Sequence, residues 1–167
     1  MMSNQAMNAL ATGQPPKRIG NANPNLGPYQ VLPCADGHFI IAVGNDGQFE
    51  RFCTLLGVPD LAHHPDYVAN KGRVVNRAAL SDSLGVETVK WTKANLLQVC
   101  EDRAVPAGPI NNMIEAFDEE QARFHDVATT TDGVPTVRSP FRIDGQPVPL
   151  RSKSPDLGSG MPEWLSE

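Results

Sequence analysis

The stretch YQVLPCADGHFIIAVGNDGQFERFCTLLG, residues 29–57, decides the fold because its hydrophobic period changes along its length. In residues 29–44, β-branched and aromatic residues flank an Asp-Gly pair, a pattern that predicts a β-hairpin. From Phe49 onward the apolar residues recur at helical spacing, which predicts a helix. Asn45 or Asp46 is the expected N-cap of this helix. A hairpin is therefore followed directly by a helix.

Toward the C-terminus the pattern stays helical. Residues 71–86 and 92–104 each carry an apolar stripe, and in the first of them Val74 and Val75 belong to the stripe. The segment VPAGPI (105–110) is expected to be extended, because its prolines exclude a central strand. A further helix is expected over residues 111–126. Strands are expected in VATTT (127–131) and TVRSPFRI (136–143), before a polar, Pro-rich tail.

Strands and helices are thus segregated along the chain rather than alternating, which favours the α+β class. We expect a β-hairpin or short antiparallel sheet packed with about four helices. An extended N-terminal linker arm and a Pro-rich C-terminal tail flank this core. The predicted division is an arm with a short helix (1–28), an α+β small domain (29–125), and strands with an extended tail (126–167).

The composition excludes several classes of protein. The chain has 167 residues and a net charge of -5, which argues against non-specific nucleic-acid binding, because such binding needs a basic face. No apolar run approaches the roughly 20 residues that cross a bilayer, and we expect no membrane association. No secretory signal is recognisable. The three cysteines have no CxxC spacing, which favours reduced thiols and a cytoplasmic protein over a disulfide framework or a zinc site.

The common catalytic motifs are absent from the sequence. It contains no G-x-S-x-G elbow, no P-loop and no H-E-x-x-H helix. The adjacent His63 and His64 point to different sides of a helix or strand, so they are not expected to share a metal ion. Six aspartates fall in expected turns and caps, without the apolar surroundings that shift a carboxyl pKa: Asp36, Asp46, Asp60, Asp66, Asp132 and Asp144. We therefore expect no catalytic residue, no metal site and no covalently bound cofactor in this chain.

The loop from Arg18 to Pro28 is the best candidate for contact with a ligand. Successive amides of a Gly- and Asn-rich turn can form a concave anion site. Lys17 and Arg18 stand beside it and could reach a phosphate. The alternative interpretation is a linker between domains that has no role in ligand binding.

Five blocks of the sequence resemble the class III CoA-transferase family, which includes formyl-CoA and carnitine CoA-transferases and α-methylacyl-CoA racemase. Together they span most of the chain in the order of the family. The blocks are PKRIGNANPN (16–25), ADGHFIIAVGNDGQF (35–49), VANKGRVVNR (68–77), VPAGPINN (105–112) and SPFRI (139–143).

The resemblance covers only the later part of the family pattern. It implies a large Rossmann-like domain, two linkers and a small α+β domain in full-length members, with two chains interlocked as rings. The transferase nucleophile of the family is an Asp in the large domain, which forms anhydride and thioester intermediates. No Asp of this sequence matches it. The resemblance therefore implies a small-domain portion, inactive alone, whose partners are a large domain or a second copy in a homo-oligomer.

The same resemblance implies the substrates and the positions that would contact them. CoA thioesters and carboxylic acids are the expected substrates, bound only together with the large domain. The loop that covers the reactive Asp falls near Gly20 to Gly27, but Asn and Pro replace a run of glycines, so a less mobile loop is expected. The expected ligand-contact residues are Gly20, Asn21, Asn23, Pro24 and Gly27 in the loop, and Ala42, Val43, Gly44 and Asn45 at the strand end.

Two alternatives stay open at this point. The chain could be a free-standing module that binds CoA or a partner, or supports assembly, without catalysis. It could also be part of an acyl-CoA racemase of the same family, since the residues that transfer protons there belong to the large domain as well.

Overall fold

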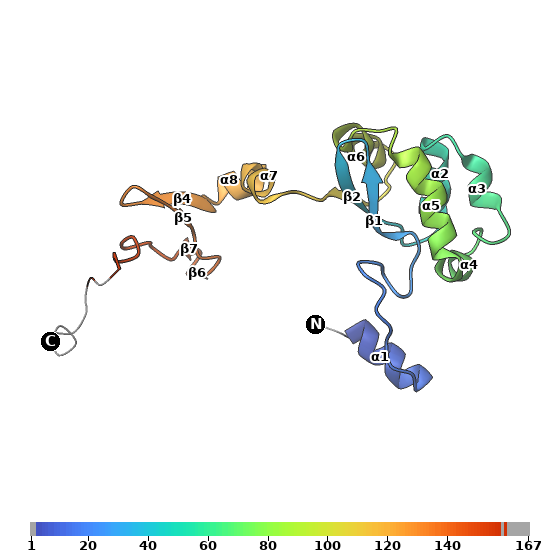
Figure 1. The fold of residues 1–167 in the computed structure, drawn as a ribbon, viewed down its shortest axis with the longest axis horizontal. Helices are drawn as coiled ribbons and strands as arrows, with labels where there is room; N and C mark the ends of the chain where they lie inside the picture. The colour runs from blue at the N-terminus through green and yellow to red at the C-terminus, as the bar shows by residue number, and fades with distance from the viewer. Residues whose placement is uncertain (1–2, 158, 160–167) are drawn as a thin grey trace. The chain divides into compact units, whose positions relative to one another are not determined.

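A computed structural model describes residues 3–157 and 159 of the chain (Figure 1). The chain forms two compact units, Met1–Ile110 and Asn111–Glu167. The three-part division expected from the sequence stays a prediction. The α+β class is confirmed, because helices pack on a short antiparallel sheet in the first unit. In the described part of the chain, no helix combines the length and the hydropathy that crossing a membrane requires.

A three-stranded antiparallel sheet forms the centre of the first unit. Its strands β1 (Tyr29–Cys34), β2 (Gly37–Ala42) and β3 (Ala107–Pro109) lie in the order β1-β2-β3. The predicted hairpin is confirmed, with Leu32 opposite Phe39 and Cys34 opposite Gly37 across the turn. The Pro-flanked β3 pairs with β2 on one side only, which is the edge position that prolines tolerate in a sheet.

Helices cover this sheet. The helix α5 contacts β1, whereas α6 contacts β2 and β3, and α2 packs against α3 and α6. In Figure 1, α2, α3 and α5 lie together beside the hairpin. The helices of the first unit are α1 (Ser3–Thr12), α2 (Asp46–Leu55), α3 (Pro59–His63), α4 (Asn70–Val75), α5 (Arg77–Thr88) and α6 (Lys93–Asp102).

The hydrophobic core joins the central strand to three helices. The buried residues that make up this core fall between residues 32 and 105. Burial of this surface supplies the main driving force for folding. Apolar side chains with almost no exposure include Phe39 and Ile41 of β2, Phe49, Phe52 and Cys53 of α2, Leu80 and Leu84 of α5, and Leu96 and Cys100 of α6.

The three cysteines are free and buried, as their spacing predicts. Burial raises the pKa of Cys53 to about 12 and that of Cys100 to about 11. Burial also raises the pKa of Cys34, and a hydrogen bond to Asp36 adds to this effect. Since the thiolate is the reactive form, these thiols are inert packing groups at neutral pH.

Two predicted helices are broken in the structure. The helix expected over residues 71–86 is divided at Asn76, whose φ of -96° and ψ of 26° depart from helical values. The predicted apolar stripe of this helix is also wrong at its start, because the structure exposes Val75 to 74 % and buries Arg73. The reason is the hydrogen bonding of Arg73, which outweighs the hydrophobic pattern of this short helix.

The second broken helix lies in the second unit. Residues 113–124 form α7 (Met113–Asp118) and α8 (Glu120–Phe124), divided at Glu119, whose ψ of 141° is extended. Asn112 caps α7 in a reciprocal capping box with Glu115. Two hairpins follow, each turning at an Asp-Gly pair with positive φ. Their strands are β4 (Ala128–Thr131), β5 (Val134–Val137), β6 (Arg142–Ile143) and β7 (Gln146–Pro147).

The second unit has no hydrophobic core of its own among its described residues, since none of them is buried. Large apolar side chains are exposed instead, including Ile114, Phe124, Phe141 and Ile143. Exposed apolar surface on this scale is typical of a surface that another protein surface covers.

Candidate functional site

The predicted ligand-contact loop folds back along the outer edge of β1. The amide of Asn23 donates to the carbonyl of Tyr29 at 2.9 Å. The side-chain oxygen of Asn21 accepts from the amide of Val31, also at 2.9 Å. An open strand edge readily pairs with other chains, and these two bonds occupy it. The side-chain oxygen of Asn21, a predicted ligand contact, is therefore already bonded to the backbone of β1.

The loop is also held by its own turn chemistry. The side-chain oxygen of Asn23 accepts from the amides of Asn25 at 2.9 Å and Leu26 at 3.2 Å. Such bonds from an Asn side chain to the following backbone fix a turn. Gly20, at φ 64°, has the left-handed conformation that glycine adopts without strain. The sequence predicts this turn chemistry correctly.

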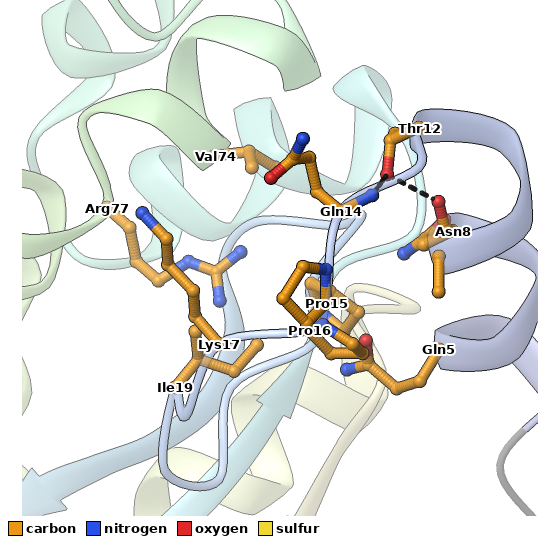
Figure 2. Close-up of a pocket in the computed structure, with 12 residues that line it drawn as sticks. Gln5, Asn8, Thr12, Gln14, Pro15, Pro16, Lys17, Ile19, Val74 and Arg77 are labelled. Carbon is orange, nitrogen blue, oxygen red and sulfur yellow. Dashed lines mark hydrogen bonds between the residues drawn. The ribbon is translucent and has the colours of Figure 1, made fainter.

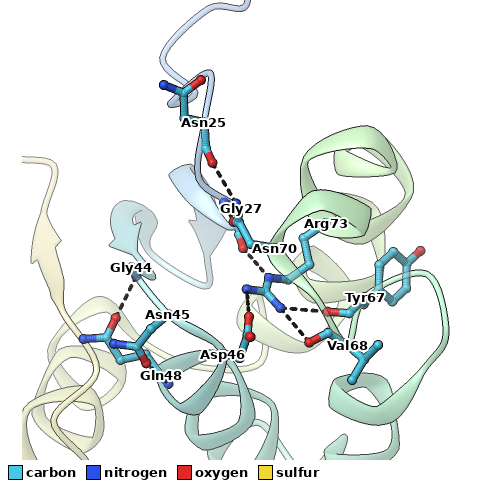
Figure 3. A network of polar contacts seen from close by, with 10 residues as sticks. All are labelled: Asn25, Gly27, Gly44, Asn45, Asp46, Gln48, Tyr67, Val68, Asn70 and Arg73. Atoms are coloured by element: carbon cyan, nitrogen blue, oxygen red, sulfur yellow. Dashed lines mark hydrogen bonds and ion pairs between the residues drawn. The ribbon is translucent and has the colours of Figure 1, made fainter. Parts of the chain in front are cut away.

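Arg73 of α4 fixes the end of the loop (Figure 3). Its Nε donates to the carbonyl of Gly27 at 2.6 Å, and its Nη1 donates to the carbonyls of Tyr67 at 2.8 Å and Val68 at 3.3 Å. Its Nη2 pairs with a carboxylate oxygen of Asp46 at the start of α2. One planar guanidinium thus joins the loop, the turn before α4 and the first turn of α2.

The environment of this guanidinium is unusual for a charge. The Arg73 side chain is 1 % exposed, whereas that of Asp46 is 66 % exposed. The guanidinium carbon also lies 4.6 Å from the centre of the Phe49 ring, in cation–π geometry. A buried charge is tolerated only when its donors are satisfied, and here several carbonyls and one carboxylate satisfy them. Arg73 is therefore a structural clamp.

Asn70, one turn before Arg73, holds the same loop. Its side-chain oxygen accepts from the amide of Gly27 at 3.1 Å, and its side-chain nitrogen donates to the carbonyl of Asn25 at 2.8 Å. Residues three apart on a helix share a face, so Asn70 and Arg73 reach the loop together. We call this pair the loop clamp. The sequence reasoning missed it, although the spacing of these two polar residues within the VANKGRVVNR block was the signal that could have found it.

Gly72 lies between the two clamp residues and permits their approach. A Cβ atom there would meet the carbonyl oxygen of Asp66 more closely than real Cβ atoms come to backbone. The helix α4 can therefore pack on the preceding turn only with glycine at this position.

The predicted strand-end residues lie next to the clamped loop. The amide of Val43 donates to the carbonyl of Pro28 at 3.0 Å, and the amide of Ala42 donates to that of Pro106 at 2.9 Å. Val43 is buried, whereas Gly44 and Asn45 are exposed at the first turn of α2. The structure thus brings Gly27 and the strand end together, and leaves Gly20 and Asn21 at the other end of the loop.

The strand end leads into a well-capped helix. The side chain of Asn45 accepts from the amide of Gln48 at 2.9 Å, which confirms the predicted N-cap of α2. The side chain of Gln48 accepts in turn from the amide of Gly44 at 2.7 Å. These bonds fix the backbone between strand and helix.

The two cations predicted as phosphate contacts, Lys17 and Arg18, occupy different positions relative to the nearest cleft. Lys17 lines a cleft of about 370 Å³ together with Pro24 of the loop and Arg77 of α5 (Figure 2). Arg18, in contrast, is not among the residues that line it. Arg77 was missed from the sequence, because it falls inside the helix expected over residues 71–86 and outside the apolar stripe of that helix.

The aspartates all lie at positions that water can reach. All eleven aspartates of the sequence lie among the described residues, and each is exposed. A hydrogen bond of 2.7 Å from the amide of Lys93 lowers the pKa of Asp36, so that this carboxylate anchors the start of α6. Within the described residues, no three His, Cys, Asp or Glu side chains gather as metal ligands would.

Comparison with protein families gives one match that spans almost the whole chain. The family model described as CoA-transferase family III matches residues 1–160. The chain is 42 % identical to a succinate–glutarate CoA-transferase of Agrobacterium fabrum over 172 aligned positions, which cover 100 % of the chain and 43 % of the relative. It is 35 % identical to an acetyl-CoA:oxalate CoA-transferase of Acetobacter aceti, over 81 % of the chain and 35 % of the relative.

A solved structure shows the same fold. A CAIB/BAIF family protein from Brucella suis superposes with a TM-score of 0.83 at 45 % identity, over 93 % of this chain and 41 % of that protein. The chain thus spans less than half the length of the relatives that it matches.

Proposed function

Because the chain belongs to CoA-transferase family III, we propose that it is the small-domain part of an enzyme that moves CoA between an acyl-CoA and a carboxylic acid. The observation that carries this proposal is the 42 % identity to a succinate–glutarate CoA-transferase along the entire chain. The names of this relative and of the acetyl-CoA:oxalate CoA-transferase support a short dicarboxylic acid as one of the substrates. They also favour CoA transfer over racemisation.

The reactive carboxylate belongs, in this proposal, to the part of the family length that the chain does not span. The surface exposure of all eleven aspartates supports it, since a nucleophilic carboxylate needs a site that excludes water. The small domain then supplies a fixed wall, formed by the loop up to Gly27 and the strand end from Ala42 to Asn45. The cytoplasmic location expected from the sequence stays a prediction.

The partner in this proposal is the remainder of the family fold, on another polypeptide segment or on a second copy of the chain. The exposed apolar side chains of the second unit support such a covering surface. The 43 % share of the Agrobacterium relative that the chain spans leaves room for a large domain.

The proposal is tested by grafting. The matching segment of the Agrobacterium enzyme is replaced by this chain, and transfer of CoA from succinyl-CoA to glutarate is measured for the chimera, the isolated chain and the remaining segment alone. We expect turnover by the chimera and none by either part. Turnover by the isolated chain would refute the proposed division of labour. A folded but inactive chimera that binds CoA would favour the binding-module alternative.

A further inference from the structure

The cleft that contains Lys17 has the composition of an anion site. It lies between α1 with the arm that follows it on one side and α4 with α5 on the other (Figure 2). The polar side chains that line it are Gln5, Asn8, Thr12, Gln14, Lys17 and Arg77. Lys17 and Arg77 carry the charge of the cleft, and none of the lining residues is acidic.

No carboxylate in the described part of the chain forms an ion pair with either cation of the cleft. Within the described residues, neither Lys17 nor Arg77 has an acidic group at ion-pair distance. Arg77 is half-buried, and its Nη2 donates to the carbonyl of Leu26 at 3.4 Å. Burial lowers the pKa of Arg77 from its ordinary value, which reflects the cost of desolvating this cation. An anion beside Arg77 would offset that cost.

The walls of the cleft are held in place. Pro15 and Pro16 restrict the backbone just before Lys17. Asn8 of α1 exchanges side-chain hydrogen bonds of 2.9 and 3.4 Å with Asn25 of the loop. The hydroxyl of Thr12 donates to the carbonyl of Asn8 at 2.7 Å, as Figure 2 shows. The cleft is therefore a defined surface of the first unit.

We propose that this cleft binds a phosphate monoester. The combined charge of Lys17 and Arg77 matches the roughly −1.5 to −2 charge of a phosphate monoester at neutral pH, whereas a carboxylate carries half as much. Arg supplies a planar fork for two phosphate oxygens, and Lys supplies a point charge. The side-chain amide groups of Gln5, Asn8 and Gln14 offer further hydrogen-bond donors. A volume of about 370 Å³ also leaves room for the organic group that carries the phosphate.

Experiment can distinguish two sources of the phosphate group that the cleft would bind. One is the phosphate monoester of CoA, an option that rests on the proposed function. The other is a free phosphate or a phosphorylated metabolite, which does not. Titration calorimetry of the chain with inorganic phosphate and 3′,5′-ADP tests the site itself. Titration with CoA and with dephospho-CoA, which lacks the monoester, identifies the source.

The variants Lys17→Gln and Arg77→Gln are each expected to weaken the binding of 3′,5′-ADP by about tenfold or more. The control Lys71→Gln removes a positive charge from an exposed position of α4 outside the cleft, and its binding is expected to equal that of the parent chain. Because Lys17 is exposed, its variant tests the site even if Arg77→Gln disturbs folding.

The absence of binding by both phosphate and 3′,5′-ADP at millimolar concentrations would overturn the proposal. Equal binding by the Lys17→Gln and Lys71→Gln variants would overturn it as well. Tighter binding of CoA than of dephospho-CoA, lost in Lys17→Gln, would support the CoA source, and equal binding of the two would support the other source. These readouts need no turnover, so an inactive chimera would count against the proposed function and leave the cleft standing.

Discussion

Replacement of Arg73 by Met is expected to lower the free energy of unfolding by about 3–5 kcal/mol. The change leaves the carbonyls of Gly27 and Tyr67 without their buried donor, and it removes the cation from the Phe49 ring. Because a folded domain is stable by only about 5–15 kcal/mol, this loss takes away a large share of the total. Urea denaturation followed by far-UV circular dichroism measures it.

Two further variants distinguish the hydrogen bonds of the Arg73 guanidinium from the effect of its positive charge. Arg73→Lys keeps a cation but not the planar fork, so we expect an intermediate loss of stability. Lys71→Met changes an exposed residue two positions earlier on the same helix and is expected to alter stability by about 0.5 kcal/mol or less. If Arg73→Met were as stable as Lys71→Met, Arg73 would not be the residue that holds the loop.

Gly72→Ala is expected to destabilise the chain by about 1–3 kcal/mol, although alanine normally favours a helix over glycine by about 1 kcal/mol. The reversed sign follows from the backbone carbonyl of Asp66, which a Cβ atom at position 72 would meet. The contact would join α4 to the backbone of Asp66, and backbone cannot move aside as a flexible side chain can. Relief of the contact would shift α4 and with it the loop clamp.

Gly85→Ala is the matched control for this prediction. Gly85 also lies within a helix, α5, but its added Cβ would meet only the Pro33 side chain, at 3.7 Å, an ordinary contact distance. We expect it to be neutral or to stabilise by up to about 1 kcal/mol. Equal midpoints of urea denaturation for the two variants would show that the close approach at Gly72 does not constrain the fold.

The parts of the fold that depend on local chemistry could be predicted from the sequence. The Asp-Gly turn of the hairpin and the Asn45 cap each involve residues a few positions apart, and both are confirmed. The Asn and Gly residues of the loop likewise signalled turns, because their side chains bond the neighbouring backbone.

The loop clamp could not be predicted in this way. Arg73 bonds the carbonyl of Gly27, 46 positions away, and no periodicity records such a pair. A pattern of hydrophobic positions places a charged residue outside and Val75 inside, whereas the structure has the reverse. The presence of Lys17 and Arg77 in one cleft could not be predicted for the same reason, because the arm and α5 are far apart in the sequence.

Chemical trapping locates the activated carboxyl in the chimeric enzyme. The chimera is incubated with succinyl-CoA and quenched with hydroxylamine, which converts an activated aspartyl carbonyl to a hydroxamate, and the modified peptide is identified by mass spectrometry. We predict a hydroxamate in the segment contributed by the Agrobacterium enzyme and none within residues 1–167. A hydroxamate on any aspartate of this chain would instead place the nucleophile within residues 1–167 and contradict a catalytic carboxyl in the large domain.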